Sequence, residues 1–239
     1  MNAADVLQWW EQGRHVPPLQ RALWYLHNDD PQLSWEQWHA MPIGERDRRL
    51  LALRARLFGP VLHVYTTCPQ CGQELEYCFN SETLAGSTTE DHCPECETAT
   101  FELDGAQIRM LNTADQMELS RLSEEQAGQF ILEHCVAVQD NLEKPALERV
   151  LEAMLKHDPL TEIMLRLQCE PCGYVWSQLL DIIRFFQIEV DDFAQTLLQQ
   201  VHILARAYGW SEQQILGLSA QRRSAYLGMV MSWGDFSID

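Results

Sequence analysis

The sequence predicts an α+β protein in which a zinc-ribbon-like β-module of two knuckle hairpins is flanked and interrupted by helical segments. Cys-x-x-Cys-Gly occurs at residues 68–72 and again at 169–173, each copy between two strand-like runs. Apolar side chains recur at helical spacing before, between and after these hairpins. We therefore expect a helical segment at 1–60, a β-module at 61–181 with a helical insertion at about 112–158, and a helical segment at 182–239.

The first 60 residues predict a series of helices. Leu19, Leu23 and Leu26 follow one another at helical spacing. Residues 34–37, Ser-Trp-Glu-Gln, match a capping box, in which serine and glutamine side chains satisfy backbone amides at the start of a helix. We expect the last of these helices to end at Gly59, because a glycine followed by proline is a common helix stop.

Alternating apolar and polar residues predict three hairpins in the middle of the chain. The expected strand pairs are residues 61–67 with 74–79, 100–104 with 107–111, and 163–168 with 174–180. The dipeptide Asp104-Gly105 is a strong signal for a type I′ turn. The polar stretch at 80–91 predicts a loop.

Further helices are expected in the insertion and at the C-terminus. Capping-box patterns occur at 113–116, 123–126 and 211–214. A helix is expected from about Pro145 to Asp158, since proline is tolerated in the first helical turn. The apolar stripe that ends at Tyr208 and Gly209 predicts a C-terminal helix, and a last helix is expected to start at Ser219.

The cysteines are the candidate ligands of a metal ion. Six of the eight lie in Cys-x-x-Cys pairs, and each pair can supply two of the four thiolates that a structural zinc ion takes. The favoured set is Cys68, Cys71, Cys169 and Cys172, because both pairs have strands on either side and a glycine after the second cysteine. Cys93 and Cys96 are the alternative partners of the first pair by sequence proximity, or they form a lesser second site with His92 or Cys78.

Charge and motif content argue against several function classes. The net charge of −18 would repel a phosphate backbone, so we expect no general nucleic-acid binding. A four-thiolate site has no open coordination position, so catalysis by this metal is not expected. The sequence contains no Gly-rich phosphate loop, no His-Glu-x-x-His and no Gly-x-Ser-x-Gly. No run of about 18 apolar residues or secretory leader is visible, so we expect a cytoplasmic protein without a membrane partner.

Two other functions remain open from the residues. A zinc ribbon followed by helices and by Arg222-Arg223 also fits a nucleic-acid-binding regulator, although the negative charge opposes it. A thiol oxidoreductase would use a Cys-x-x-Cys pair, but none of the three pairs lies in the βαβ context typical of such enzymes.

The chain resembles the baseplate hub assembly chaperone family of contractile-tailed phages and phage-like contractile injection systems. The resemblance covers nearly the whole chain and is carried by residues 50–60, both knuckles at 68–72 and 169–173 with Trp176, the run Val201-His202-Ile203-Leu204-Ala205-Arg206-Ala207-Tyr208-Gly209-Trp210-Ser211, Ile215-Leu216, and Arg222-Arg223 with Tyr226-Leu227. The C-terminal run is the most specific part, because each knuckle alone occurs in many unrelated proteins.

The resemblance implies a non-enzymatic role in building the baseplate or its central hub, with hub or spike proteins as partners, in the cytoplasm. It adds weight to the set of Cys68, Cys71, Cys169 and Cys172 as zinc ligands. The pair formed by Cys93 and Cys96 departs from the family pattern.

Overall fold

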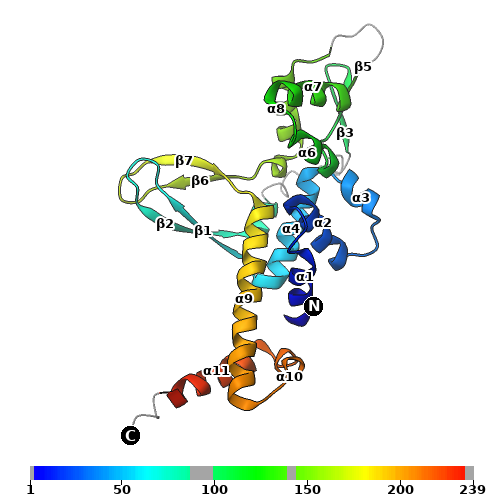
Figure 1. The fold of residues 1–239 in the computed structure, drawn as a ribbon. Helices are drawn as coiled ribbons and strands as arrows, with labels where there is room; N and C mark the ends of the chain where they lie inside the picture. The colour runs from blue at the N-terminus through cyan, green and yellow to red at the C-terminus, as the bar shows by residue number, and fades with distance from the viewer. Residues whose placement is uncertain (1–2, 87–98, 139–143, 235–239) are drawn as a thin grey trace. The chain divides into compact units, whose positions relative to one another are not determined.

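The computed structural model describes residues 3–86, 99–138 and 144–234 (Figure 1). The predicted α+β class is confirmed, with helices and three small antiparallel sheets. The chain divides into two compact units, one made of Met1–Arg21 with Phe186–Asp239 and the other of Ala22–Phe185. No helix in the described ranges is both long and apolar enough to span a bilayer.

Both knuckle hairpins belong to the larger unit. Strands β1 (Val61–Thr67) and β2 (Glu74–Asn80) pair from Val61 opposite Asn80 to Thr67 opposite Glu74. Strands β6 (Met164–Gln168) and β7 (Val175–Leu179) pair from Met164 opposite Leu179 to Gln168 opposite Val175. In every strand, exposed residues alternate with residues that are buried or half-buried. Each hairpin therefore has one inward and one outward face.

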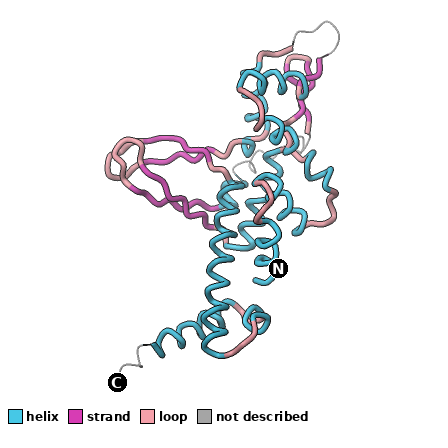
Figure 2. Tube along the Cα trace, viewed as in Figure 1, coloured by secondary structure: helices cyan, strands magenta, loops and turns pink. Residues whose placement is uncertain are grey.

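The inward faces of the two hairpins pack against each other. The Thr66 hydroxyl donates to Oε1 of Gln178 at 2.8 Å, and the Tyr77 hydroxyl donates to the carbonyl of Gln168 at 2.9 Å. The rings of Tyr77 and Trp176 meet edge to face, with centroids 6.3 Å apart. Figure 2 shows the two hairpins side by side in magenta, with both connecting turns at the same end. This packing brings the two Cys-x-x-Cys turns together.

Helices α2 (Pro18–Asp29), α3 (Trp35–Ala40), α4 (Ile43–Phe58) and α5 (Ser81–Gly86) precede or follow the first hairpin. The predicted capping box at Ser34 is present, and α4 ends at Gly59, whose φ of 91° suits a glycine. The loop predicted at 80–91 is wrong at its start, where α5 forms. The side chain of Asn80 accepts a hydrogen bond from the Glu82 amide at 2.8 Å, and this contact starts the helix locally.

A second part of this unit combines a three-stranded sheet with three helices. The sheet has the order β3 (Thr100–Leu103), β4 (Ala106–Arg109), β5 (Val136–Val138), and the helices are α6 (Thr113–Leu119), α7 (Glu124–His134) and α8 (Leu147–His157), followed by the short helix η2 (Pro159–Thr161). Asp104 and Gly105 have φ of 52° and 79°, as the expected tight turn requires. The core between sheet and helices includes Ile108, Val136 and Val150.

A buried polar network and one close approach connect α4 with this part of the unit. Arg46 is 1% exposed, donates to Asp47 at 2.7 Å and reaches Thr113 and Gln116 at 3.2 and 2.6 Å. Near the start of α4, a Cβ on Gly44 would lie 2.0 Å from a carboxylate oxygen of Asp158. A side chain at residue 44 would therefore collide with a buried carboxylate.

The smaller unit contains α1 (Ala3–Gly13), α10 (Glu212–Leu216), α11 (Ala220–Gly234) and the part of α9 (Ile182–Tyr208) that follows residue 185. Leu7 packs against Ala194 and Leu197. The indole of Trp10 donates to Oδ1 of Asp191 at 2.8 Å, which fixes α1 on the long helix. The predicted capping box at Ser211 is present.

Candidate metal centre

Four cysteine sulfurs converge where the two hairpin turns meet. The Sγ atoms of Cys68, Cys71, Cys169 and Cys172 all lie within 4.8 Å of one another. The contacts cross from one hairpin to the other: Cys68 Sγ is 3.7 Å from Cys172 Sγ, and Cys71 Sγ is 3.6 Å from Cys169 Sγ. Cys68 and Cys169, the first cysteine of each pair, are buried, whereas the second of each pair is exposed.

The two turns have the same backbone geometry, which follows from their shared sequence pattern. In the first, the Cys68 amide donates to the Gln73 carbonyl at 2.9 Å and the Gly72 amide donates to the Cys68 carbonyl at 2.9 Å. The second turn repeats these bonds at 2.8 and 2.7 Å. Gly72 and Gly173 both have a φ of 74°, a conformation that a side chain would strain. The glycine after each pair thus lets the chain double back with both sulfurs on one side.

The pKa values of the two buried thiols, Cys68 and Cys169, are shifted in opposite directions. Burial opposes ionisation of Cys68, but hydrogen bonds from the backbone of Cys71 and Gln70 outweigh it and lower the pKa of Cys68 to about 7. Burial raises the pKa of Cys169 to about 12. A metal cation at the centre of the cluster would stabilise all four thiolates, because each sulfur would then face a positive charge.

The geometry of the cluster fits a tetrahedral metal ion. With metal–sulfur bonds of about 2.3 Å and tetrahedral angles, neighbouring sulfurs lie about 3.7 to 3.8 Å apart. The two cross-hairpin distances, 3.7 and 3.6 Å, are close to this spacing. The cluster can therefore hold a metal ion, and four sulfur donors would leave it no open position.

The structure places the cysteines of the favoured set together, although 97 residues of chain lie between Cys71 and Cys169. The alternative ligands Cys93 and Cys96, and His92 beside them, lie outside the described residues. Cys135 is buried at the end of α7, where burial raises its pKa to about 11, and Arg109 contacts its sulfur at 3.5 Å.

Sequence reasoning considered Cys78 only as a partner of Cys93 and Cys96, and it missed a second group of metal-ligand types that contains this residue. His63, Glu76 and Cys78 lie on the outward face of the first hairpin, with one donor atom from each within 4.8 Å of the others. The alternation of side chains along a strand could have revealed this group, because residues 76 and 78 lie on the same face of β2 and residue 63 pairs with residue 78.

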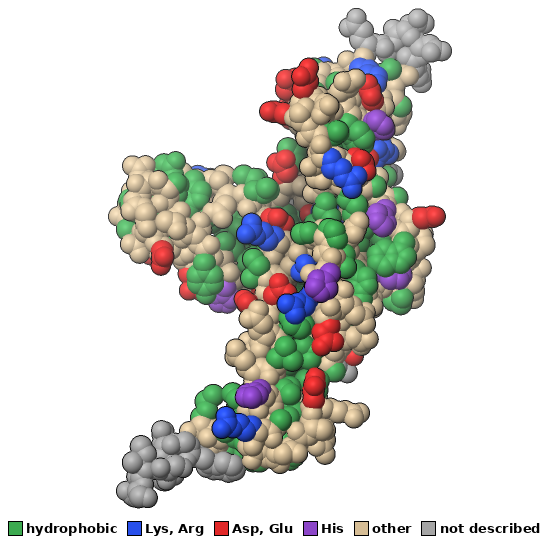
Figure 3. Space-filling model, viewed as in Figure 1, with side chains coloured by type: hydrophobic (Ala, Val, Ile, Leu, Met, Phe, Trp, Pro, Cys, Tyr) green, Lys and Arg blue, Asp and Glu red, His purple; other side chains and the backbone are tan. Residues whose placement is uncertain are grey.

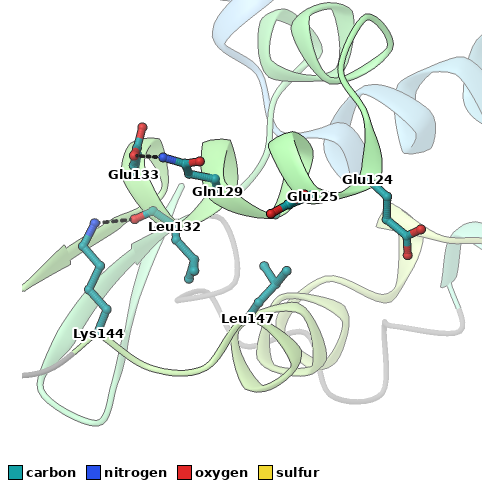
Figure 4. A pocket seen from close by; sticks show the side chains of 8 residues that line it. Glu124, Glu125, Gln129, Leu132, Glu133, Lys144 and Leu147 are labelled. Atoms are coloured by element: carbon teal, nitrogen blue, oxygen red, sulfur yellow. Dashed lines mark hydrogen bonds between the residues drawn. The ribbon is translucent and has the colours of Figure 1, made fainter.

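A pocket of about 580 Å³ lies between α7 and α8 (Figure 4). Glu124, Glu125 and Glu133 contribute carboxylates, and leucine side chains from both helices line it. Lys144 donates to the Leu132 carbonyl at 2.7 Å, and Gln129 donates to Glu133 at 2.8 Å. Several polar groups of this pocket thus bond to one another.

The chain was compared with models of protein families, with curated proteins and with solved structures. None of the three comparisons found a match.

Proposed function

We propose that the protein is a non-enzymatic assembly factor or component of a contractile injection system or phage baseplate. In this proposal it works in the cytoplasm, binds hub or spike proteins, and carries a structural zinc ion on Cys68, Cys71, Cys169 and Cys172. The observation that carries it is the closed four-sulfur cluster, which suits a structural role, together with the motif resemblance described above.

Zinc is the metal that the donor set favours. Soft thiolates in a tetrahedral arrangement are typical of zinc and of iron–sulfur centres, and the matched Cys-x-x-Cys-Gly hairpins are those of a zinc ribbon. Metal analysis of the purified protein should give zinc in stoichiometric amount and a colourless solution. A coloured protein with iron in place of zinc would contradict this assignment.

Recognition of another protein is supported by apolar side chains on the outward face of the second hairpin. Met164 and Leu179 are cross-strand partners and are 53% and 56% exposed. Val175, on the same face, is 44% exposed. Exposed apolar groups that lie next to one another are typical of protein contact sites.

Nucleic-acid binding finds less support. Figure 3 shows lysine and arginine side chains interspersed with aspartate and glutamate on the face that it draws, and the chain as a whole has 35 acidic against 17 basic residues. A salt-dependent shift of DNA in a gel would favour the regulator over the assembly factor.

Affinity purification of the tagged protein from cells that produce the whole particle tests the proposed function. We expect baseplate hub or spike proteins to co-purify, and the double variant Met164→Ser/Leu179→Ser to recover less of them. Ser177→Ala is the matched control, because Ser177 is exposed on β7, the strand that carries Leu179. Recovery of no baseplate protein from expressing cells would refute the proposal.

A further inference from the structure

The outward face of the first hairpin carries three side chains of metal-ligand type, His63, Glu76 and Cys78. The register of β1 and β2 sets His63 opposite Cys78 and Tyr65 opposite Glu76. His63, Glu76 and Cys78 are all exposed, so ions from solvent can reach them directly. Their presence on one face follows from the pleat, because residues 76 and 78 are two apart.

Two of the distances between these groups can be compared with those of a tetrahedral metal site, and all three donor atoms lie within 4.8 Å of one another. Cys78 Sγ lies 3.6 Å from His63 Nδ1. With bonds of about 2.0 Å to nitrogen and about 2.3 Å to sulfur, tetrahedral zinc places the two donors about 3.5 Å apart. Glu76 Oε1 lies 2.8 Å from His63 Nδ1, in a hydrogen bond, and it would move about 0.5 Å away to reach the spacing of two zinc ligands.

A further contact orients the carboxylate. The Tyr65 hydroxyl donates to Glu76 Oε1 at 3.0 Å. Outer contacts of this kind fix the direction of metal ligands in known sites and tune their affinity. The group therefore contains three donors of different chemistry and a hydroxyl that holds one of them in place.

We propose that His63, Glu76 and Cys78 form a second zinc site, exposed on the hairpin surface, with three protein ligands and one open coordination position. Water fills the open position in the isolated protein, as in other three-ligand zinc sites. The site differs from the four-cysteine cluster in its donors, its exposure and its open position, and it does not depend on the proposed baseplate function.

Titration with zinc chloride, followed by metal analysis after removal of loosely bound ions, tests the second site. We expect one zinc equivalent more in the wild-type protein than in His63→Ala or Cys78→Ser. Glu74→Gln is the matched control, since Glu74 is exposed on the same face of β2 and lies outside the group. Circular dichroism checks that the variants are folded, which their exposed positions favour.

The alkylation rate of Cys78, followed by peptide mass spectrometry, provides a second measurement. Zinc should slow this alkylation in the wild type and in Glu74→Gln but not in His63→Ala. Cobalt substitution should show a second equivalent with the weak sulfur-to-metal band of one thiolate. Equal alkylation rates with and without zinc would overturn the proposal, and so would an extra zinc equivalent that persists in both ligand variants.

Discussion

A metal ion on the four cysteines would link the two hairpins, and this link can be tested. Cys71 and Cys169 are 98 residues apart in the chain, yet their sulfurs are 3.6 Å apart in the fold. In the unfolded chain, a metal ion can bind the pairs at 68/71 and 169/172 together only if the loop between them closes. Closing a loop of about 100 residues costs about 4.7 kcal/mol in chain entropy. The folded protein has already closed it, so zinc should bind the folded state more tightly and stabilise it by roughly that amount.

Urea denaturation followed by circular dichroism measures this stabilisation. We compare wild-type protein with saturating zinc and with a strong chelator, and expect the free energy of unfolding to fall by roughly 4 to 5 kcal/mol on chelation. The double variant Cys169→Ser/Cys172→Ser removes the second knuckle's ligands and should lose most of this response to the chelator, because the exposed group of His63, Glu76 and Cys78 does not join the two hairpins. The matched control is Cys93→Ser/Cys96→Ser, which should respond as the wild type does.

The opposite pattern would refute this reasoning. If chelation still destabilises the variant without Cys169 and Cys172, but no longer affects the variant without Cys93 and Cys96, the metal joins the sequence-local pairs. Metal analysis of the same samples separates this result from a general loss of folding. The result stands if the variant without Cys169 and Cys172 is folded and keeps a zinc equivalent that the variant without Cys93 and Cys96 has lost.

Three further predictions concern the fold. Gly44→Ala should lower the free energy of unfolding by about 2 kcal/mol, because its Cβ would collide with the buried Asp158 carboxylate. Gly228→Ala in α11 should raise the free energy of unfolding by about 0.5 kcal/mol, because nothing lies within 4 Å of the added Cβ. Urea denaturation measures both changes. Arg46→Met should cost about 3 kcal/mol in thermal denaturation, because it leaves the Asp47 carboxylate buried without its partner. Burial raises the pKa of Asp158, so the folded state binds the carboxyl proton of Asp158 more tightly than the unfolded state does. The free energy of unfolding should therefore fall as pH rises from about 3.8 through the raised pKa. Denaturation measured between about pH 4 and 7 should show a smaller fall in Asp158→Asn.

Local features were predictable because their signals lie within a few residues. The knuckle hairpins, the Asp104-Gly105 turn and the capping boxes at Ser34, Ser123 and Ser211 are present where the sequence places them. Each depends on turn or cap chemistry that a single residue type supplies. The grouping of the four cysteines also followed from local likeness, since two matched hairpins can share one ion.

Features decided by distant contacts were missed or shifted. The capping box predicted at 113–116 is wrong by one residue: Asn112 caps α6, because the Thr113 side chain is buried against Arg46. Strand β5 has three residues, too few for a visible alternation, and it forms because β4 offers it an edge. The predicted division into segments at residues 60 and 181 stays a prediction, since the compact units follow spatial packing.

The distance in sequence between the two knuckles has a consequence during protein synthesis. Ribosomes add about 5 to 20 residues per second, so about 5 to 20 seconds pass between the emergence of Cys71 and that of Cys169. Cys93 and Cys96 leave the ribosome within that interval, before the second knuckle exists. A metal ion captured early can meet the first knuckle and this middle pair but not the second knuckle. If it binds the first two, the four-cysteine site then requires ligand exchange on the newly made chain. The order of synthesis thus gives the middle cysteines a period in which they compete for the ion.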